Sequence, residues 1–246
     1  MPTPRRSAPR VAGKRRTPPR KAPARRAGDP YAEMVLRERA EKDRFLATQP
    51  ESPFSEAGLP FHPLVYFPVD PEFRVTARLR EEKHPSESWL RTSQDGHAAM
   101  RKLGTLSFSL KGRRLSLELF HAGPAAGNIA FLPFRDRTSG SETYGPGRYL
   151  TLELREEGIY ELDFNRSFNP YCAYTPTYEC PFPPPANDLP VPVRAGERVY
   201  DPGNNPSSPE QAIRKLTEDF RERQAHAHPP GPSSPKLASG SGGGSP

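Results

Sequence analysis

Two alternating segments in "LSFSLKGRRLSLEL", residues 106–119, constrain the fold of this chain most strongly. Leucine or phenylalanine occupies every second position of each segment, and serine or glutamate occupies most of the positions between. A period of two is typical of a strand with one apolar face. With the turn at Lys111–Arg114, Leu110 should face Leu115 and Phe108 should face Leu117. Both apolar stripes then lie on one side of a β-hairpin.

Other segments extend this β pattern along the chain. "FRVTARL" (73–79) alternates and predicts a strand with one solvated face, whereas "NIAFLPF" (128–134) is apolar on both faces and predicts an interior strand. "RYLTLELREEGIYELDF" (148–164) predicts a second hairpin with its loop at 156–158, in which Leu152 faces Leu162. The proline-interrupted residues 59–73 favour short edge strands and turns.

A helix is expected at each end of this β region. Asp29 followed by Pro30 indicates an N-cap and a first turn, so a charged helix should run to about Thr48. Ser208 and Gln211 resemble a capping box, and they open an amphipathic helix predicted over residues 205–225.

The two termini lack the apolar side chains that a folded core requires. Residues 1–28 are rich in Pro, Ala and Arg, and residues 226–246 are rich in His, Pro, Gly and Ser, so we expect both tails to be disordered. The interpretation is a mainly β protein: one antiparallel barrel or sandwich over residues 29–204, with an N-terminal and a C-terminal helix.

The positive charge of the chain belongs to the N-terminal tail. Residues 1–27 carry ten Lys/Arg and no acid, out of 36 basic and 29 acidic residues overall, which leaves 26 against 29 elsewhere. Such a tail can make weak, salt-sensitive contacts with nucleic acid or an anionic membrane surface, or it can simply keep the protein in solution. No signal-peptide core and no run of about 18 apolar residues is present, so we expect a cytoplasmic protein without a membrane span.

Polar residues concentrate in two turn-rich segments, "FRDRTSGSETYGPGRY" (134–149) and "DFNRSFNPYCAYTPTYECPFPP" (163–184), which flank the predicted second hairpin. Loops joined to the same end of a hairpin lie close together, and functional residues often occupy such loops. We expect residues 135–148 and 163–187 to form a common mouth, lined by Arg135, Asp136, Thr138, Ser139, Tyr144, Arg148, Asp163, Asn165, Asn169 and Asn187.

The chemistry of this mouth favours a small polar or anionic ligand. Arg135 and Arg148 can hold a carboxylate or phosphate bidentately, although Asp136 and Asp163 can equally neutralise them in internal ion pairs. Taken singly, the Asn and Asp residues are more typical of backbone capping. No cofactor motif is present, because the glycines of "TSGSETYGPG" lack the Gly-Lys-Ser/Thr ending of a phosphate loop.

The same mouth could instead be hydrolytic, with Asp163 as general base or Cys172 as nucleophile. Cys172 and Cys180 do not predict a metal site, since structural zinc needs four ligands. A disulfide across this loop is sterically feasible but is disfavoured in a reducing cytoplasm. We therefore interpret both thiols as small buried groups that anchor the loop.

"FRDRTSGSETYGPGRYL", "DFNRSFNPYCAY" and "YECPFPPPANDLPVPVRAGE" together resemble the signature of the bacterial and archaeal family catalogued as domain of unknown function 1684. The upstream "KDRFLATQPESPF" and "LVYFPVDPEFRVTARL" are similar to its opening segments, so the resemblance spans roughly Tyr31 to Tyr200. It implies a self-contained, β-rich cytoplasmic domain and no particular reaction.

Overall fold

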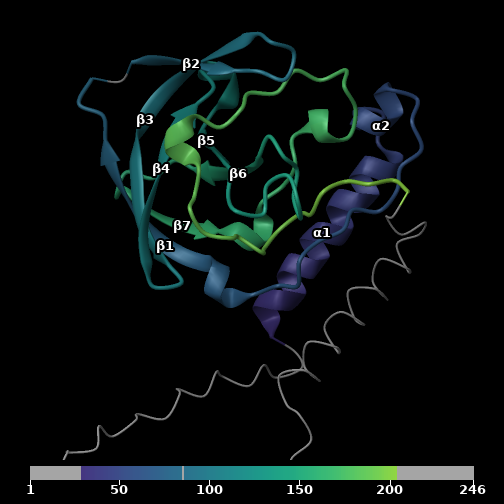
Figure 1. Ribbon diagram of the computed structural model, residues 1–246, viewed down its shortest axis with the longest axis horizontal. Helices are drawn as coiled ribbons and strands as arrows, with labels where there is room; N and C mark the ends of the chain where they lie inside the picture. The colour runs from purple at the N-terminus through teal and green to yellow at the C-terminus, as the bar shows by residue number, and fades with distance from the viewer. Residues whose placement is uncertain (1–28, 85, 204–246) are drawn as a thin grey trace, which may run out of the picture.

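Seven strands of the chain form one antiparallel sheet that curls into a nearly closed barrel (Figure 1). The structure, a computed structural model, describes residues 29–84 and 86–203. The helices and strands are α1 (Pro30–Thr48), α2 (Pro53–Glu56), β1 (Arg74–Glu81), β2 (Glu87–Arg91), β3 (His97–Leu110), β4 (Arg113–His121), β5 (Ile129–Phe134), β6 (Arg148–Glu153) and β7 (Ile159–Asp163). The mainly β prediction is confirmed, and of the two architectures considered the barrel is the observed one.

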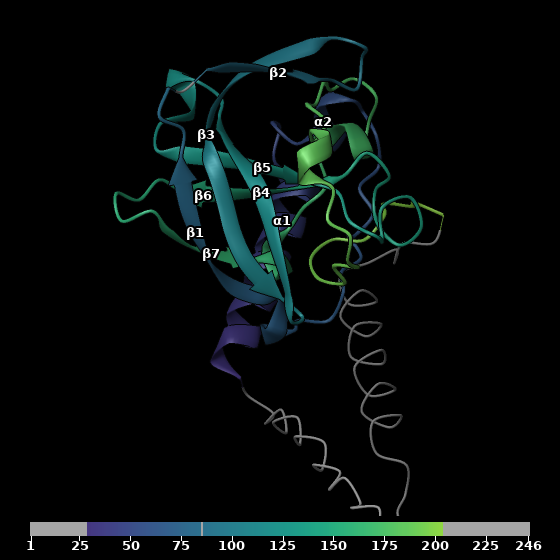
Figure 2. The same cartoon turned by 60° about the vertical axis from the view of Figure 1, so that its left-hand side comes forward.

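The sheet runs in the order β6-β5-β4-β3-β1-β7, and β2 pairs with β3 outside this path. The long strand β3 serves two partners because a bulge between Lys102 and Gly104 bends it. Its first part pairs with β2 and its second part with β1. Figure 2 shows the result, with β2 lying across one end of the wall that β3 and β4 form.

The hairpin of β3 and β4 exists, with both apolar stripes on one face as expected, but its register differs from the prediction. Phe108 pairs with Leu115 and Leu106 with Leu117. The turn is only Lys111-Gly112, with φ of 49° and 76°, which is the geometry of a tight two-residue hairpin turn. The predicted four-residue turn was therefore too long, and the predicted pairing was shifted by two residues.

The second predicted hairpin is wrong. Strands do form at both places, but β6 pairs with β5, and β7 pairs with β1 at the other edge of the sheet. Alternation predicts a strand and its apolar face, and it carries no information about which partner the strand takes. The two strands instead fill the two edges of the barrel wall.

Helix α1 begins and ends where the sequence predicts. The side chain of Asp29 accepts a hydrogen bond from the backbone N–H of Tyr31 at 3.0 Å, and Gln49 ends the helix. The residues that α1 buries are Val35, Arg39 and Leu46, so an arginine lies on the face that packs inward. No helix in the described part of the chain is long and apolar enough to cross a membrane.

The main core fills the barrel, and the segment 189–195 contributes to it. Leu189, Val191, Val193 and Ala195 are buried, while the prolines and arginine between them are exposed. Prolines cannot donate to a ladder, so this stretch covers the barrel without extending the sheet. The C-terminal helix predicted over 205–225 and the tails at 1–28 and 226–246 lie outside the described residues.

Candidate functional site

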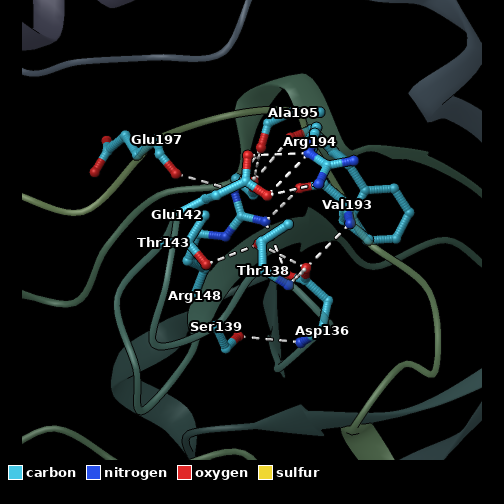
Figure 3. Close-up of polar contacts among 12 residues, drawn as sticks. Asp136, Thr138, Ser139, Glu142, Thr143, Arg148, Val193, Arg194, Ala195 and Glu197 are labelled. Atoms are coloured by element: carbon cyan, nitrogen blue, oxygen red, sulfur yellow. Dashed lines mark hydrogen bonds and ion pairs between the residues drawn. The ribbon is translucent and has the colours of Figure 1, made fainter.

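Arg148 is fully buried and lies at the centre of a polar network (Figure 3). Its guanidinium donates to Asp136 Oδ2 at 3.0 Å, to the carbonyl of Val193 at 2.8 Å and to that of Glu197 at 3.0 Å, and also to the carbonyl of Ala195. Burial lowers the pKa of Arg148, and the Asp136 carboxylate opposes that shift. Of the two roles considered for this arginine, the structure shows the internal ion pair.

Asp136 completes the same network from the other side (Figure 3). Its Oδ1 accepts from the backbone and hydroxyl of Thr138 and from the backbone N–H of Val193 at 3.0 Å, and Ser139 Oγ accepts from the Asp136 N–H at 3.1 Å. The network thus ties the 136–148 loop to segment 193–197. Arg135, by contrast, is exposed, so it does not share the buried surroundings of Arg148.

Asp163 and Asn165 come together at a second place, beside the start of α1. Asp163 accepts from the hydroxyl of Tyr31 at 2.7 Å, and burial together with this carboxylate raises the pKa of Tyr31. Asn165 exchanges two hydrogen bonds of 2.8 Å with the backbone of Asp70. Both side chains are buried, and they join β7 to α1 and to the segment before β1.

The side chains of Asn187 and Asn169 each hydrogen-bond to backbone groups, at two separate places in the fold. The amide of Asn187 donates to the carbonyls of Glu118 and Pro133 and accepts from the Glu118 N–H at 2.6 Å. It thereby bridges β4 and β5 beside a proline that has no N–H to donate. Asn169 donates its backbone N–H to Glu197 and its side chain to the Arg198 carbonyl at 2.8 Å.

A cavity of about 160 Å³ opens between α1 and the segment that follows β7. We call it the α1 cavity, and the residues that line it are Val35, Glu38, Arg39, Lys42, Tyr66, Asn165, Arg166, Ser167, Phe168 and Glu197. Asn165 is the one residue that this lining shares with the mouth predicted from sequence. Segment 163–169 therefore contributes to the cavity from its helix-facing side.

Arg39 dominates the electrostatics of the α1 cavity. It is 7% exposed, donates to the carbonyls of Phe67 at 2.9 Å and Asn165 at 3.0 Å, and lies over the Tyr66 ring. Its Nε and the hydroxyl of Tyr66 have no hydrogen-bond partner in the structure. These hydrogen bonds go to neutral oxygens, so the positive charge of Arg39 is not neutralised by a hydrogen-bonded carboxylate.

The other charges of the α1 cavity are paired. Lys42 contacts the buried carboxylate of Glu197, and Arg166 pairs with Glu38 at 2.7 Å on the exposed rim. Two anions therefore offset two of the three cations that line the cavity. Burial raises the pKa of nearby Asp43 to about 7, which weakens the negative charge it can offer at neutral pH. The residues that line the cavity therefore carry one more positive than negative charge, and Asp163, just outside the lining, also pairs with Arg166 at 3.6 Å.

The spacing of residues in α1 could have indicated the α1 cavity from the sequence alone. Val35, Arg39, Lys42 and Leu46 recur at the i, i+4, i+7, i+11 spacing of a single helix face. Two cations on the inward face of a helix require partners within the fold, and that pattern points to Arg39 and Lys42. The partner Tyr66 gave no such signal, because it lies in a segment without regular periodicity.

Cys172 and Cys180 lie together at a third place, with Tyr144. The backbone N–H of Cys172 is 3.4 Å from Cys180 Sγ, and the hydroxyl of Tyr144 is 3.6 Å from Cys172 Sγ. Both thiols are free, Cys180 is buried and Cys172 is partly exposed. Asp163 and Cys172 thus lie in different surroundings, the first with Tyr31 and the second with Tyr144. Among the described residues, no group of three or more His, Cys, Asp or Glu side chains could hold a metal.

The chain is similar to one family of proteins and to a solved structure. The model of a family described as "Protein of unknown function (DUF1684)" matches residues 60–198. A solution NMR structure of an uncharacterized protein from Haloarcula marismortui is 36% identical, with a TM-score of 0.55, over 69% of this chain and 95% of that chain. No curated protein matches the chain.

Proposed function

The chain belongs to the DUF1684 family of proteins of unknown function, and from its geometry we propose that it binds a small anion in the α1 cavity. The observation that carries this proposal is the buried Arg39, whose guanidinium donates only to carbonyl oxygens beside a hollow. An arginine held in this way attracts a carboxylate or phosphate more strongly than one on the surface, since water screens it less.

The size of the cavity limits the ligand. Pockets for drug-sized molecules usually measure about 300–1,000 Å³, and this one measures about 160 Å³. The lining also includes Val35 and Phe168, which favour an apolar group next to the charge. A short-chain monocarboxylate fits both features, and inorganic phosphate fits the charge alone.

Arg166 offers a test that should leave the fold intact, because it lies on the exposed rim. We expect Arg166→Gln to weaken binding of propionate by about 1.4- to fivefold, as one exposed cation contributes only about 0.2–1 kcal/mol. Isothermal titration calorimetry at constant ionic strength measures this change, with phosphate as a second arm that separates the two ligand classes.

The matched control is Arg194→Gln. Arg194 also forms an exposed ion pair, with Glu142 at 2.8 Å, but it does not line the α1 cavity. Its replacement should leave the affinity unchanged, and propionamide, which lacks the charge, should not bind. Equal loss of affinity in both variants would show that propionate senses the overall charge and not the cavity.

A second proposal concerns residues 1–27, which we expect to contact nucleic acid in a cytoplasmic protein. Its support is the sequence alone, ten basic residues without an acid. Deletion of this segment should abolish retention on immobilised DNA in low salt, because counterion release depends on the number of cations. If the shortened protein elutes at the same salt concentration as the full chain, the tail has no such role.

A further inference from the structure

The loop that carries the two cysteines is held firmly at one end. Cys180 makes two hydrogen bonds with Ser93: the Ser93 N–H donates to the Cys180 carbonyl at 3.0 Å, and the Cys180 N–H donates to the side-chain Oγ of Ser93 at 3.0 Å. The next residues continue along β2, where the Phe182 N–H donates to the Arg91 carbonyl. The buried thiol of Cys180 therefore has a fixed position against the barrel.

Cys172 approaches that fixed thiol from a short helical turn. Tyr171–Ala173 form this turn, which brings the Cys172 N–H to 3.4 Å from Cys180 Sγ. Cys172 is partly exposed, while Cys180 is buried. Of the two neighbouring cysteines, Cys172 is therefore the one that a small molecule reaches more readily.

The groups around Cys172 favour its thiolate. Hydrogen bonds from Cys180, Tyr144 and Ser93 outweigh burial and lower the pKa of Cys172 to about 6. Burial and the neighbouring sulfur raise the pKa of Tyr144, so its hydroxyl keeps its proton. The hydrogen bond with Cys172, together with burial, raises the pKa of Cys180. Burial likewise raises the pKa of the nearby Tyr149 of β6, and a hydrogen bond with Glu56 raises that of Tyr178.

We propose that Cys172 and Cys180 form a reactive thiol pair that reduces small hydroperoxides and closes to a disulfide. The geometry that supports it is a partly exposed Cys172, a buried Cys180 whose sulfur lies 3.4 Å from the Cys172 N–H, and the Tyr144 hydroxyl 3.6 Å from the Cys172 sulfur. This activity is independent of anion binding in the α1 cavity.

The chemistry balances without any further reactant. The Cys172 thiolate attacks one oxygen of the hydroperoxide, the O–O bond breaks, and the leaving alkoxide or hydroxide takes up a proton from water, which balances the proton released when Cys172 ionised. The Cys180 thiol then attacks the sulfur of the resulting sulfenic acid, the S–S bond forms and water leaves. Two thiols and one hydroperoxide become one disulfide, one alcohol or water molecule, and one water molecule. A thiol reductant restores the pair.

The test uses the full chain and hydrogen peroxide. Trypsin cuts after Arg166 and Arg194, and no lysine or arginine lies between them, so both cysteines fall in one peptide. After treatment with about one equivalent of peroxide per protein, that peptide should lose two hydrogen atoms in mass and regain them with dithiothreitol. The rate of alkylation of Cys172 by iodoacetamide should show a midpoint below the usual thiol value of about 8.5.

Two variants separate the roles of the groups. Cys180→Ser should stop at the sulfenic acid, which dimedone traps on Cys172, and Tyr144→Phe should raise the midpoint of alkylation. If Cys180→Ser fails to fold, the mass of the wild-type tryptic peptide after peroxide treatment still shows whether the two cysteines form a disulfide. Cysteines that stay reduced, or that form disulfides only between molecules, would overturn the proposal, as would a Cys172 midpoint near 8.5.

Discussion

Replacement of Arg148 by methionine should lower the free energy of unfolding by about 3–5 kcal/mol, the usual effect of removing one partner of a buried ion pair. Methionine fills part of the space but makes none of the hydrogen bonds to Asp136, Val193, Ala195 and Glu197. The carboxylate of Asp136, which is 5% exposed, would then be left without its charge partner. A typical domain is stable by only about 5–15 kcal/mol. The loss should therefore be visible as a large shift of the urea midpoint.

Arg194→Met is the matched control for this experiment. It removes an arginine from the same segment, but that arginine is exposed and its pair with Glu142 contributes about 0–1 kcal/mol. Arg148→Lys should give an intermediate loss, since a single ammonium cannot reach the carboxylate and three carbonyls at once. If Arg148→Met and Arg194→Met unfold at the same urea concentration, the buried network does not stabilise the loops.

Replacement of Gly196 by alanine should cost about 2–5 kcal/mol, combining backbone strain with overpacking. The φ of Gly196 is +74°, and a Cβ there would overlap the side chain and carbonyl of Ser167 and lie 2.8 Å from the Phe164 carbonyl. This glycine lies between Ala195 and Glu197, whose carbonyls both accept from Arg148. Its bend is therefore needed for the same network.

Gly58→Ala separates the effect of backbone strain from that of overpacking. Gly58 has a similar φ of +64°, but nothing lies within 4 Å of the Cβ it would gain. The Gly58→Ala variant should therefore lose only the free energy of unfolding that backbone strain costs, about 1–2 kcal/mol. Equal losses at the two positions, measured by urea unfolding, would mean that segment 164–167 moves aside without cost.

The local parts of the fold could be read from the sequence because they depend on neighbours in the chain. The cap of α1 at Asp29 and the hairpin of β3 and β4 are of this kind, and both are found. The partners of β6 and β7 could not be read, because β6 pairs with the preceding strand β5 across a long irregular loop and β7 pairs with β1, far away in the sequence. Barrel closure is a tertiary property that alternation does not encode.

In the candidate site, too, the local contacts could be predicted from the sequence and the distant ones could not. Asp and Asn in a turn-rich loop predicted polar contacts, and the structure places Asp136, Asn169 and Asn187 in such contacts with backbone. The sequence could not decide between backbone and ligand as the partner, since that depends on burial. Arg148 illustrates this: its guanidinium is wholly enclosed by Asp136 and the 193–197 segment, which lies far along the chain.

Residue-resolved NMR during titration with propionate tests most directly whether the α1 cavity is the anion site. Backbone amides of residues 35–42 and 165–168 should shift together and saturate, with smaller shifts for propionamide at the same concentration. Saturating shifts confined to residues 135–148, or shifts that never saturate anywhere, would contradict an anion site beside Arg39.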